Sequence, residues 1–195
     1  MNLSERVKEN FNALIQLQME SSTLLAEPIA RSAELVVQRL LEGGKILSCG
    51  NGGAAGNAQH FCTLMINRYQ RERPGLPALS LSNDTATLTS IAGDYDYDEV
   101  FAKQVGTLGH PGDILLAISN SGNSENVNAA IQAAHERDMP VIALNGRDGG
   151  RLAGILQPND IELRVTSDDS ARIQEIHLLT IHCLCDLIDQ QLLGG

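Results

Sequence analysis

Residues 113–124 read DILLAISNSGNS. Residues 114–118 form an unbroken apolar run, which is typical of a strand buried on both faces of a parallel sheet. Residues 119–124, the serine loop, hold three serines, two asparagines and one glycine. Apolar residues at helical spacing then continue to about Arg137. The stretch therefore predicts a strand, a polar turn and a helix, which is the repeating unit of an α/β sheet.

The same unit recurs on both sides of this stretch. Together with 113–118, four further short apolar runs predict strands: 45–49, 78–82, 141–145 and 161–165. Most of these runs end in a turn rich in glycine or serine, and helical patterns follow, for example at 54–67 and 170–193. Right-handed crossovers would arrange these elements as a five-stranded parallel sheet between two layers of helices. The predicted fold class is thus α/β, a three-layer α-β-α sandwich.

The first 43 residues carry helical spacing and no strand pattern. We expect two helices here, because Pro28 suits the first turn of a second helix that stops at Gly43 and Gly44. The length of 195 residues is typical of one domain. We therefore predict a single domain over 1–195, with 1–43 packing in an oligomer and 44–195 forming the α/β core. The charged run at 68–73, RYQRER, is interpreted as a solvated surface segment.

Composition excludes several classes of protein. The net charge of -10 argues against direct binding of nucleic acid, which needs clustered positive charge. No apolar run approaches the ~18 residues of a membrane span, and the polar start is unlike a secretory signal, so we expect a cytoplasmic location. The four cysteines lie in apolar segments and are expected to be buried thiols in a reducing compartment: Cys49, Cys62, Cys183 and Cys185.

The serine loop is the first candidate ligand site, because ligands of open parallel sheets bind at the carboxyl ends of the strands. Backbone N–H groups at a helix start favour an anion, and hydroxyls add neutral donors. The alternative is a polar turn that merely caps the helix. Three serines in six residues exceed the need of one cap. We therefore expect Ser119, Ser121 and Ser124 to bind a phosphate group.

The glycine loop, residues 49–56 (CGNGGAAG), is the second candidate. Its glycines allow close approach of backbone to a ligand, so Asn51, Gly52 and Gly53 are candidate contacts. It is not a phosphate-binding P-loop, because no Gly-Lys-Ser/Thr follows, and its third glycine comes one residue too late for a dinucleotide fingerprint. His60 lies on the next helix. Two further candidates lie on the last helix, only about 80° apart around its axis: Gln174 and His182.

Five motifs follow one another along the chain: LSCGNGGAAGNAQHF (47–61), the ERP–LPA stretch around Pro74 and Pro77, DILLAISNSGNS (113–124), GRDGG (146–150) and ARIQEIHLLTIHCLCDLID (171–189). On these motifs the chain resembles the sugar-isomerase (SIS) domain family, in the branch that holds phosphoheptose isomerase and the initiator-associating protein DiaA. The resemblance implies a homotetramer with sugar-phosphate sites at subunit interfaces. It also places Asp94 and Asn120 among the substrate contacts.

The resemblance implies a zinc site in the isomerase branch, held by a His and a Glu one turn apart and by a Gln and a His on the last helix. The matching residues are His60, Gln174 and His182, but the Glu position is Leu64. In the family that Glu is also the proposed base, and the residue at His182 is the proposed acid/base. Leucine neither accepts a proton nor binds zinc. We therefore expect an impaired catalytic site and little or no zinc.

DiaA-type proteins keep the fold without the full catalytic set and bind the replication initiator DnaA. An apolar pair near their C-terminus contributes to that binding, and Leu192 and Leu193 occupy the comparable place. We therefore expect a DnaA-binding regulator of replication initiation that retains a sugar-phosphate pocket. Two alternatives stay open. One is an isomerase that converts sedoheptulose 7-phosphate to a heptose 7-phosphate for lipopolysaccharide, and the other is a sugar-phosphate sensor with another partner.

Overall fold

The computed structural model describes residues 2–194, and a five-stranded parallel sheet lies at its centre. The strands are β1 (Ile46–Gly50), β2 (Ala78–Ser80), β3 (Ile114–Ser119), β4 (Val141–Gly146) and β5 (Ile161–Val165). Their order across the sheet is β2-β1-β3-β4-β5. The direction of winding reverses between β1 and β3, and such a switch point is where open α/β sheets bind ligands.

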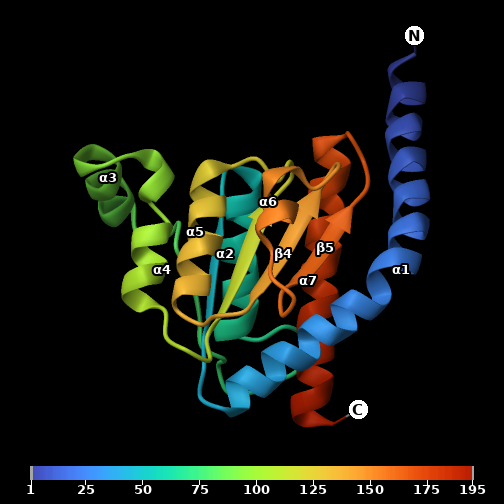
Figure 1. Ribbon diagram of the computed structural model, residues 1–195. Coiled ribbons are helices and arrows are strands. Elements are labelled where there is room, and N and C mark those ends of the chain that lie inside the picture. Colours follow the sequence, from blue (N-terminus) through green and yellow to red (C-terminus); the bar gives the residue numbers. More distant parts are fainter. Residues whose placement is uncertain (1, 195) are drawn as a thin grey trace.

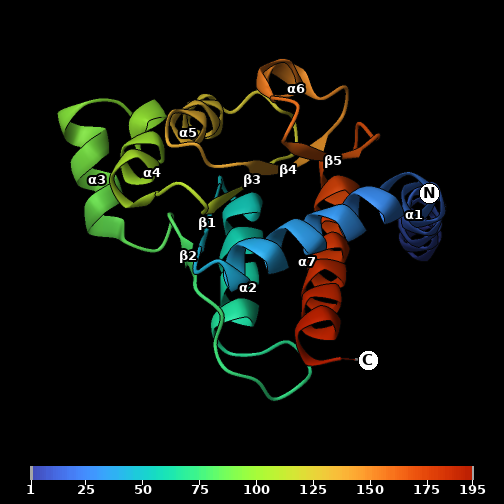
Figure 2. The same ribbon diagram turned by 60° about the horizontal axis from the view of Figure 1, so that its bottom comes forward.

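Helices cover both faces of the sheet, as Figure 2 shows, so the predicted sandwich is confirmed. One face carries α1 (Leu3–Leu41), α2 (Gly53–Ile66) and α7 (Ser170–Leu193). The other carries α4 (Ala102–Leu108), α5 (Glu125–Glu136) and α6 (Gly150–Ile155), with α3 (Thr85–Asp94) and the 3₁₀ helix η1 (Tyr97–Glu99) beside α4. The segment η1–α4 had no counterpart among the predicted elements.

The strands β1, β3 and β4 are buried on both faces because helices cover both sides of the sheet, whereas β5 carries the half-buried Glu162 and Arg164 on one face. Leu116 and Leu144 belong to the apolar cluster under α1, α2 and α7. Their neighbours Leu115 and Ala143 belong to the cluster under α4, α5 and α6. This two-sided burial explains the unbroken apolar runs from which the sheet was predicted.

The N-terminal segment is one helix, so the prediction of two helices is wrong. Pro28 lies inside α1, where it removes a single backbone donor while the helix continues on both sides. Figure 1 shows a bend in α1, and an internal proline is a usual cause of such a bend. The half before the bend stands away from the sheet. Five of its apolar side chains, spaced four residues apart, are exposed: Leu3, Val7, Phe11, Ile15 and Met19.

The charged run 68–73 is not wholly a surface segment, because the Arg73 side chain is buried. Its Nε donates to Asp189 Oδ1 at 2.6 Å, and the side chains of this ion pair are only 1% and 4% exposed. The same guanidinium donates to the carbonyl oxygens of Leu64 and Met65 at 2.9 and 2.8 Å. Arg73 thus ties the last turn of α2 to α7.

The cysteines are free thiols, as predicted. Cys49, Cys62 and Cys185 are buried and Cys183 is half-buried. Burial raises the pKa of the Cys49 thiol to about 12.

Within residues 2–194, no helix is both long enough and apolar enough to cross a membrane.

Candidate functional site

The glycine loop and the serine loop meet at the switch point between β1 and β3. Asn51 follows β1, and its Nδ2 donates to Asn126 Oδ1 at 2.7 Å. The Asn126 amide returns a hydrogen bond to Asn51 Oδ1 at 3.0 Å. Since Asn126 lies in the first turn of α5, just after the serine loop, this amide pair joins the two loops. Tyr97 donates a third hydrogen bond to Asn51 Oδ1, at 3.4 Å.

Hydrogen bonds within the serine loop fold it into a tight turn. Ser119 Oγ accepts from the Gly122 N–H at 3.1 Å, and Ser121 Oγ accepts from the Asn123 N–H at 3.3 Å. Ser124 occupies the N-cap position of α5, but its side chain makes no capping hydrogen bond. Helix capping therefore does not account for this serine, and its hydroxyl remains suited to a ligand.

Asn120 has an unsatisfied acceptor. Its Nδ2 donates to the Ser170 carbonyl oxygen at 3.3 Å, which links the serine loop to the start of α7. Its Oδ1 is buried and has no hydrogen-bond partner among the described residues. Buried polar atoms are normally paired. A ligand hydroxyl at this position would supply the missing donor.

Gln174 lies directly on the glycine loop. A Cβ added to Gly53 would overlap the Gln174 side-chain amide, so a larger residue here would displace that amide. Gly52 has a φ of 54°, which also favours glycine. The structure thus brings together Asn51, Gly52, Gly53 and Gln174.

His60 and His182 also converge, from α2 and α7. Their Nε2 atoms lie 3.0 Å apart, and the two rings meet edge to face. Burial, followed by the charge of His60, lowers the pKa of His182 below the ordinary value of 6.5. His182 is therefore a neutral imidazole near pH 7, which is the form that accepts a proton. Tyr69, which sequence analysis missed, stacks on His182 with ring centroids 5.9 Å apart.

The donor set does not fit a resident zinc ion. Two imidazole nitrogens on one tetrahedral zinc lie about 3.3 Å apart, so the spacing of His60 and His182 is suitable. However, Leu64 offers no carboxylate on the turn after His60. The described part of the chain contains no cluster of three or more His, Cys, Asp or Glu residues that could hold a metal. Gln174 would be the only further ligand from the predicted set, and it carries no charge.

Three other predicted site residues lie apart from the histidine pair. Asp94 is the last residue of α3 and is exposed, and α3 and α7 lie on opposite sides of the sheet (Figure 2). Leu192 is partly buried against the apolar core, whereas Leu193 is 43% exposed. The two leucines therefore do not form one exposed apolar pair.

Known structures share this fold over nearly the whole chain. The phosphoheptose isomerase GmhA from Neisseria gonorrhoeae is 50% identical, with a TM-score of 0.92, covering 97% of this chain and 100% of that chain. A phosphoheptose isomerase from Francisella tularensis is 46% identical, with a TM-score of 0.95 and the same coverage.

Sequence comparison agrees. A phosphoheptose isomerase from Alkalilimnicola ehrlichii is 59% identical over 195 residues, covering 100% of both chains. One from Chromohalobacter salexigens is 58% identical, covering 100% of this chain and 99% of the relative.

These names correct the main functional expectation. Full-length relatives at this identity are phosphoheptose isomerases, so the interpretation as a DnaA-binding regulator acting through Leu192 and Leu193 is overturned. The absence of a carboxylate at Leu64 therefore does not by itself indicate a regulator. The predicted family is confirmed: the SIS domain model matches residues 9–146. The chain belongs to the SIS domain family, with strong homology to phosphoheptose isomerase.

Proposed function

We propose that this chain is an isomerase that interconverts sedoheptulose 7-phosphate and D-glycero-D-manno-heptose 7-phosphate, in the supply of heptose for lipopolysaccharide. The names of its full-length relatives support this proposal. The observation that carries it is the contact between His60 and His182, because it places a proton acceptor on α7, the helix whose Gln174 lies against the glycine loop.

The serine loop is the proposed phosphate site. Ser121 and Ser124 are partly exposed hydroxyls at the start of α5, where the helix dipole favours an anion. Asn120, with its unpaired Oδ1, is suited to a sugar hydroxyl. The glycine loop and Gln174 would line the path from the phosphate toward the histidines.

Ketose–aldose isomerisation needs a base for a carbon-bound proton and a donor for the carbonyl oxygen. We assign His182 Nε2 as the base that removes a proton from C1 of the ketose, so that the C–H electrons form the enediol double bond. His60 donates a proton to the C2 oxygen. Return of a proton to C2 and loss of the O1 proton then give the aldose. The sugar must enter between the two imidazoles, so their contact opens on binding.

We also propose that the protein forms a homotetramer. The exposed apolar side chains along the outer half of α1 support this, because a stripe of this kind normally meets a partner surface. A solution mass of four times the 20.9 kDa chain is expected in light scattering. A monomer mass would contradict it.

Turnover of sedoheptulose 7-phosphate tests the proposed activity. The purified protein is incubated with the ketose, with a chelator or with added zinc, and the aldose is followed by NMR. We expect aldose formation that the chelator leaves unchanged. Calorimetric binding of the sugar without aldose in either condition would refute the activity and favour the sugar-phosphate sensor. Turnover that requires zinc would refute the assignment of His182 as the unaided base.

A further inference from the structure

The serine loop lies directly against the turn at residues 146–150. A Cβ added to Gly122 would overlap the Gly149 carbonyl oxygen, and one added to Gly150 would overlap the Ser121 carbonyl oxygen. The two backbones are therefore in contact. The start of α6 adds a hydrogen bond from the Leu152 N–H to the Gly122 carbonyl oxygen at 2.9 Å. The position of the serine loop thus depends on the position of this turn.

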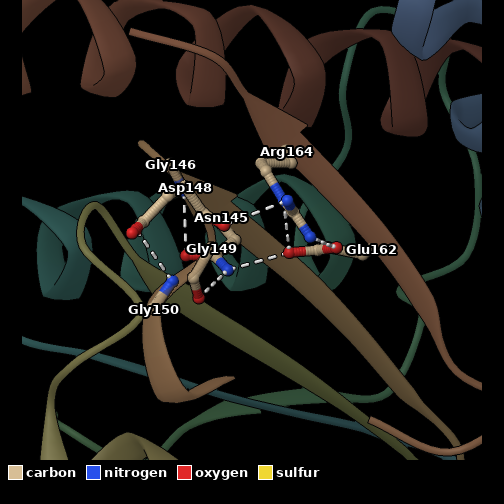
Figure 3. Close-up of polar contacts among 7 residues, drawn as sticks. All are labelled: Asn145, Gly146, Asp148, Gly149, Gly150, Glu162 and Arg164. Atoms are coloured by element: carbon tan, nitrogen blue, oxygen red, sulfur yellow. Dashed lines mark hydrogen bonds and ion pairs between the residues drawn. The ribbon is translucent and has the colours of Figure 1, made fainter. Parts of the chain in front are cut away.

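Asn145, at the end of β4, holds the turn in place. Its side chain is fully buried, and its Nδ2 donates to the Gly149 carbonyl oxygen at 2.7 Å. Its Oδ1 accepts from the Gly146 N–H at 2.9 Å. The Asn145 side-chain amide therefore bonds to the backbone near both ends of the turn, at Gly146 and at Gly149 (Figure 3).

Glu162 on β5 fixes the orientation of the Asn145 amide. Glu162 Oε1 accepts from Asn145 Nδ2 at 2.9 Å and from Arg164 Nε, also at 2.9 Å. Arg164 donates a second hydrogen bond to Glu162 Oε2, and its Nη1 donates to the Asp148 carbonyl oxygen at 3.0 Å. Figure 3 shows the guanidinium and the carboxylate beside the turn. Because the carboxylate only accepts, it keeps the amide nitrogen toward Gly149 and the amide oxygen toward Gly146.

We propose that Asn145 and Glu162 are positioning residues of the phosphate site, acting through the turn at 146–150. This inference rests on the proposed function, since it takes the serine loop as the phosphate site. Neither residue meets the ligand. They hold the Gly149 carbonyl under Gly122, which keeps the donors of the serine loop directed at one point. An anion site needs such preorganised donors, because reorienting them on binding costs affinity.

Glu162→Ala tests the proposal. Loss of the carboxylate frees the Asn145 amide to turn, so we expect the KM for sedoheptulose 7-phosphate and its calorimetric Kd to rise about tenfold. The kcat is expected to change less than about twofold, because the histidine pair is untouched. Glu162→Gln keeps an acceptor oxygen for Asn145 and is expected to recover most of the affinity.

Two control variants separate positioning from general stability. Arg151→Ala removes an exposed ion pair with Glu125 beside the same loop but outside the Asn145–Glu162 network, and should leave KM unchanged. Asp113→Asn weakens the partly buried pair with Lys45 at the amino end of β3, so it should lower stability without raising KM. An equal rise of KM in Asp113→Asn and Glu162→Ala would overturn the proposal.

Hydrogen exchange separates this proposal from the proposed activity, because it needs no turnover. In the free protein, the amides of residues 120–123 are expected to exchange at least about tenfold faster in Glu162→Ala than in the parent. Calorimetry with inorganic phosphate should show weaker binding in the same variant. If the parent shows no turnover but Glu162→Ala still shows faster exchange and weaker phosphate binding, the proposed activity is refuted and the positioning role is supported. Unchanged exchange and unchanged phosphate affinity would overturn the positioning role.

Discussion

The two ends of the candidate site are built in different ways. The serine loop consists of backbone and neutral side chains, and the Asn145–Glu162 network holds it from one edge of the sheet. The histidine pair comes from two helices that the buried Arg73–Asp189 pair ties together. The loop contains three serines, whereas the turn after His60 carries Leu64 and no carboxylate. The proposed phosphate site and the proposed base therefore depend on separate supports, and substitutions should separate their effects.

The largest expected effect is on proton transfer. His182→Asn removes the proposed base while keeping a polar side chain, and we expect kcat to fall about 10²- to 10⁴-fold. The calorimetric Kd for sedoheptulose 7-phosphate should stay within about twofold, because the serine loop is intact. Cys183→Ala, at the neighbouring half-buried position, is the matched control and should retain activity. A Kd that weakens as much as kcat falls would show that the two ends are not separate.

The next effect concerns the support of the histidine pair. Asp189→Asn leaves the Arg73 guanidinium buried without a counter-charge, so we expect the free energy of unfolding to drop by about 3–5 kcal/mol. Denaturant unfolding measures this loss. Glu72→Gln breaks the exposed Arg68–Glu72 pair of the same segment and should cost less than about 1 kcal/mol. Equal losses of unfolding free energy in the two variants would show that the buried Arg73–Asp189 ion pair does not stabilise the fold.

A third prediction concerns His177, which lies on α7 between the two ends. It is fully buried, its Nε2 lies 2.9 Å from the Asn145 carbonyl oxygen, and burial lowers its pKa to about 4. The unfolded chain binds the proton near pH 6.5, whereas the folded chain resists it until about pH 4. Stability is therefore full above pH 6.5 and falls as the pH drops, by roughly 3 kcal/mol at pH 4.

Unfolding at pH 7 and at pH 4.5 in the parent and in His177→Met measures this contribution. The variant should lose less stability over this interval, because it lacks the titrating group. The same pH dependence in both proteins would show that His177 does not remain neutral in the fold.

The smallest predicted effect is on the phosphate end. Ser124→Ala removes one hydroxyl donor, and we expect the Kd for sedoheptulose 7-phosphate to rise about three- to tenfold with kcat nearly unchanged. Ser22→Ala, on the outer half of α1, is the control and should bind as the parent does. A loss of kcat in Ser124→Ala without loss of affinity would place this serine at the proton-transfer end instead.

The sequence predicted the sheet and both loops because local signals define them. Unbroken apolar runs such as 114–118 occur where both sheet faces are covered. The prediction of two N-terminal helices from Pro28 was wrong, because proline occurs both in the first turn of a helix and at a bend inside one. Arg73 and Tyr69 were missed, since only the folded chain brings them to Asp189 and His182.

The residues that hold the serine loop in place could not be predicted from the sequence either. Asn145 and Glu162 are 17 residues apart and meet because β4 and β5 pair in parallel. No spacing rule predicts that contact. For function, the presence of Leu64 at the expected Glu position favoured the prediction of a regulator. His60, Gln174 and His182 favoured the isomerase, which the names of the relatives support.

The role of His182 as the base is tested most directly by following the carbon-bound hydrogens of sedoheptulose 7-phosphate by NMR in D₂O, with the parent and with His182→Asn. We expect aldose formation with the parent, and an unchanged ketose with His182→Asn despite normal binding of the sugar. An unchanged ketose with the parent, or equal aldose formation by both proteins, would contradict it.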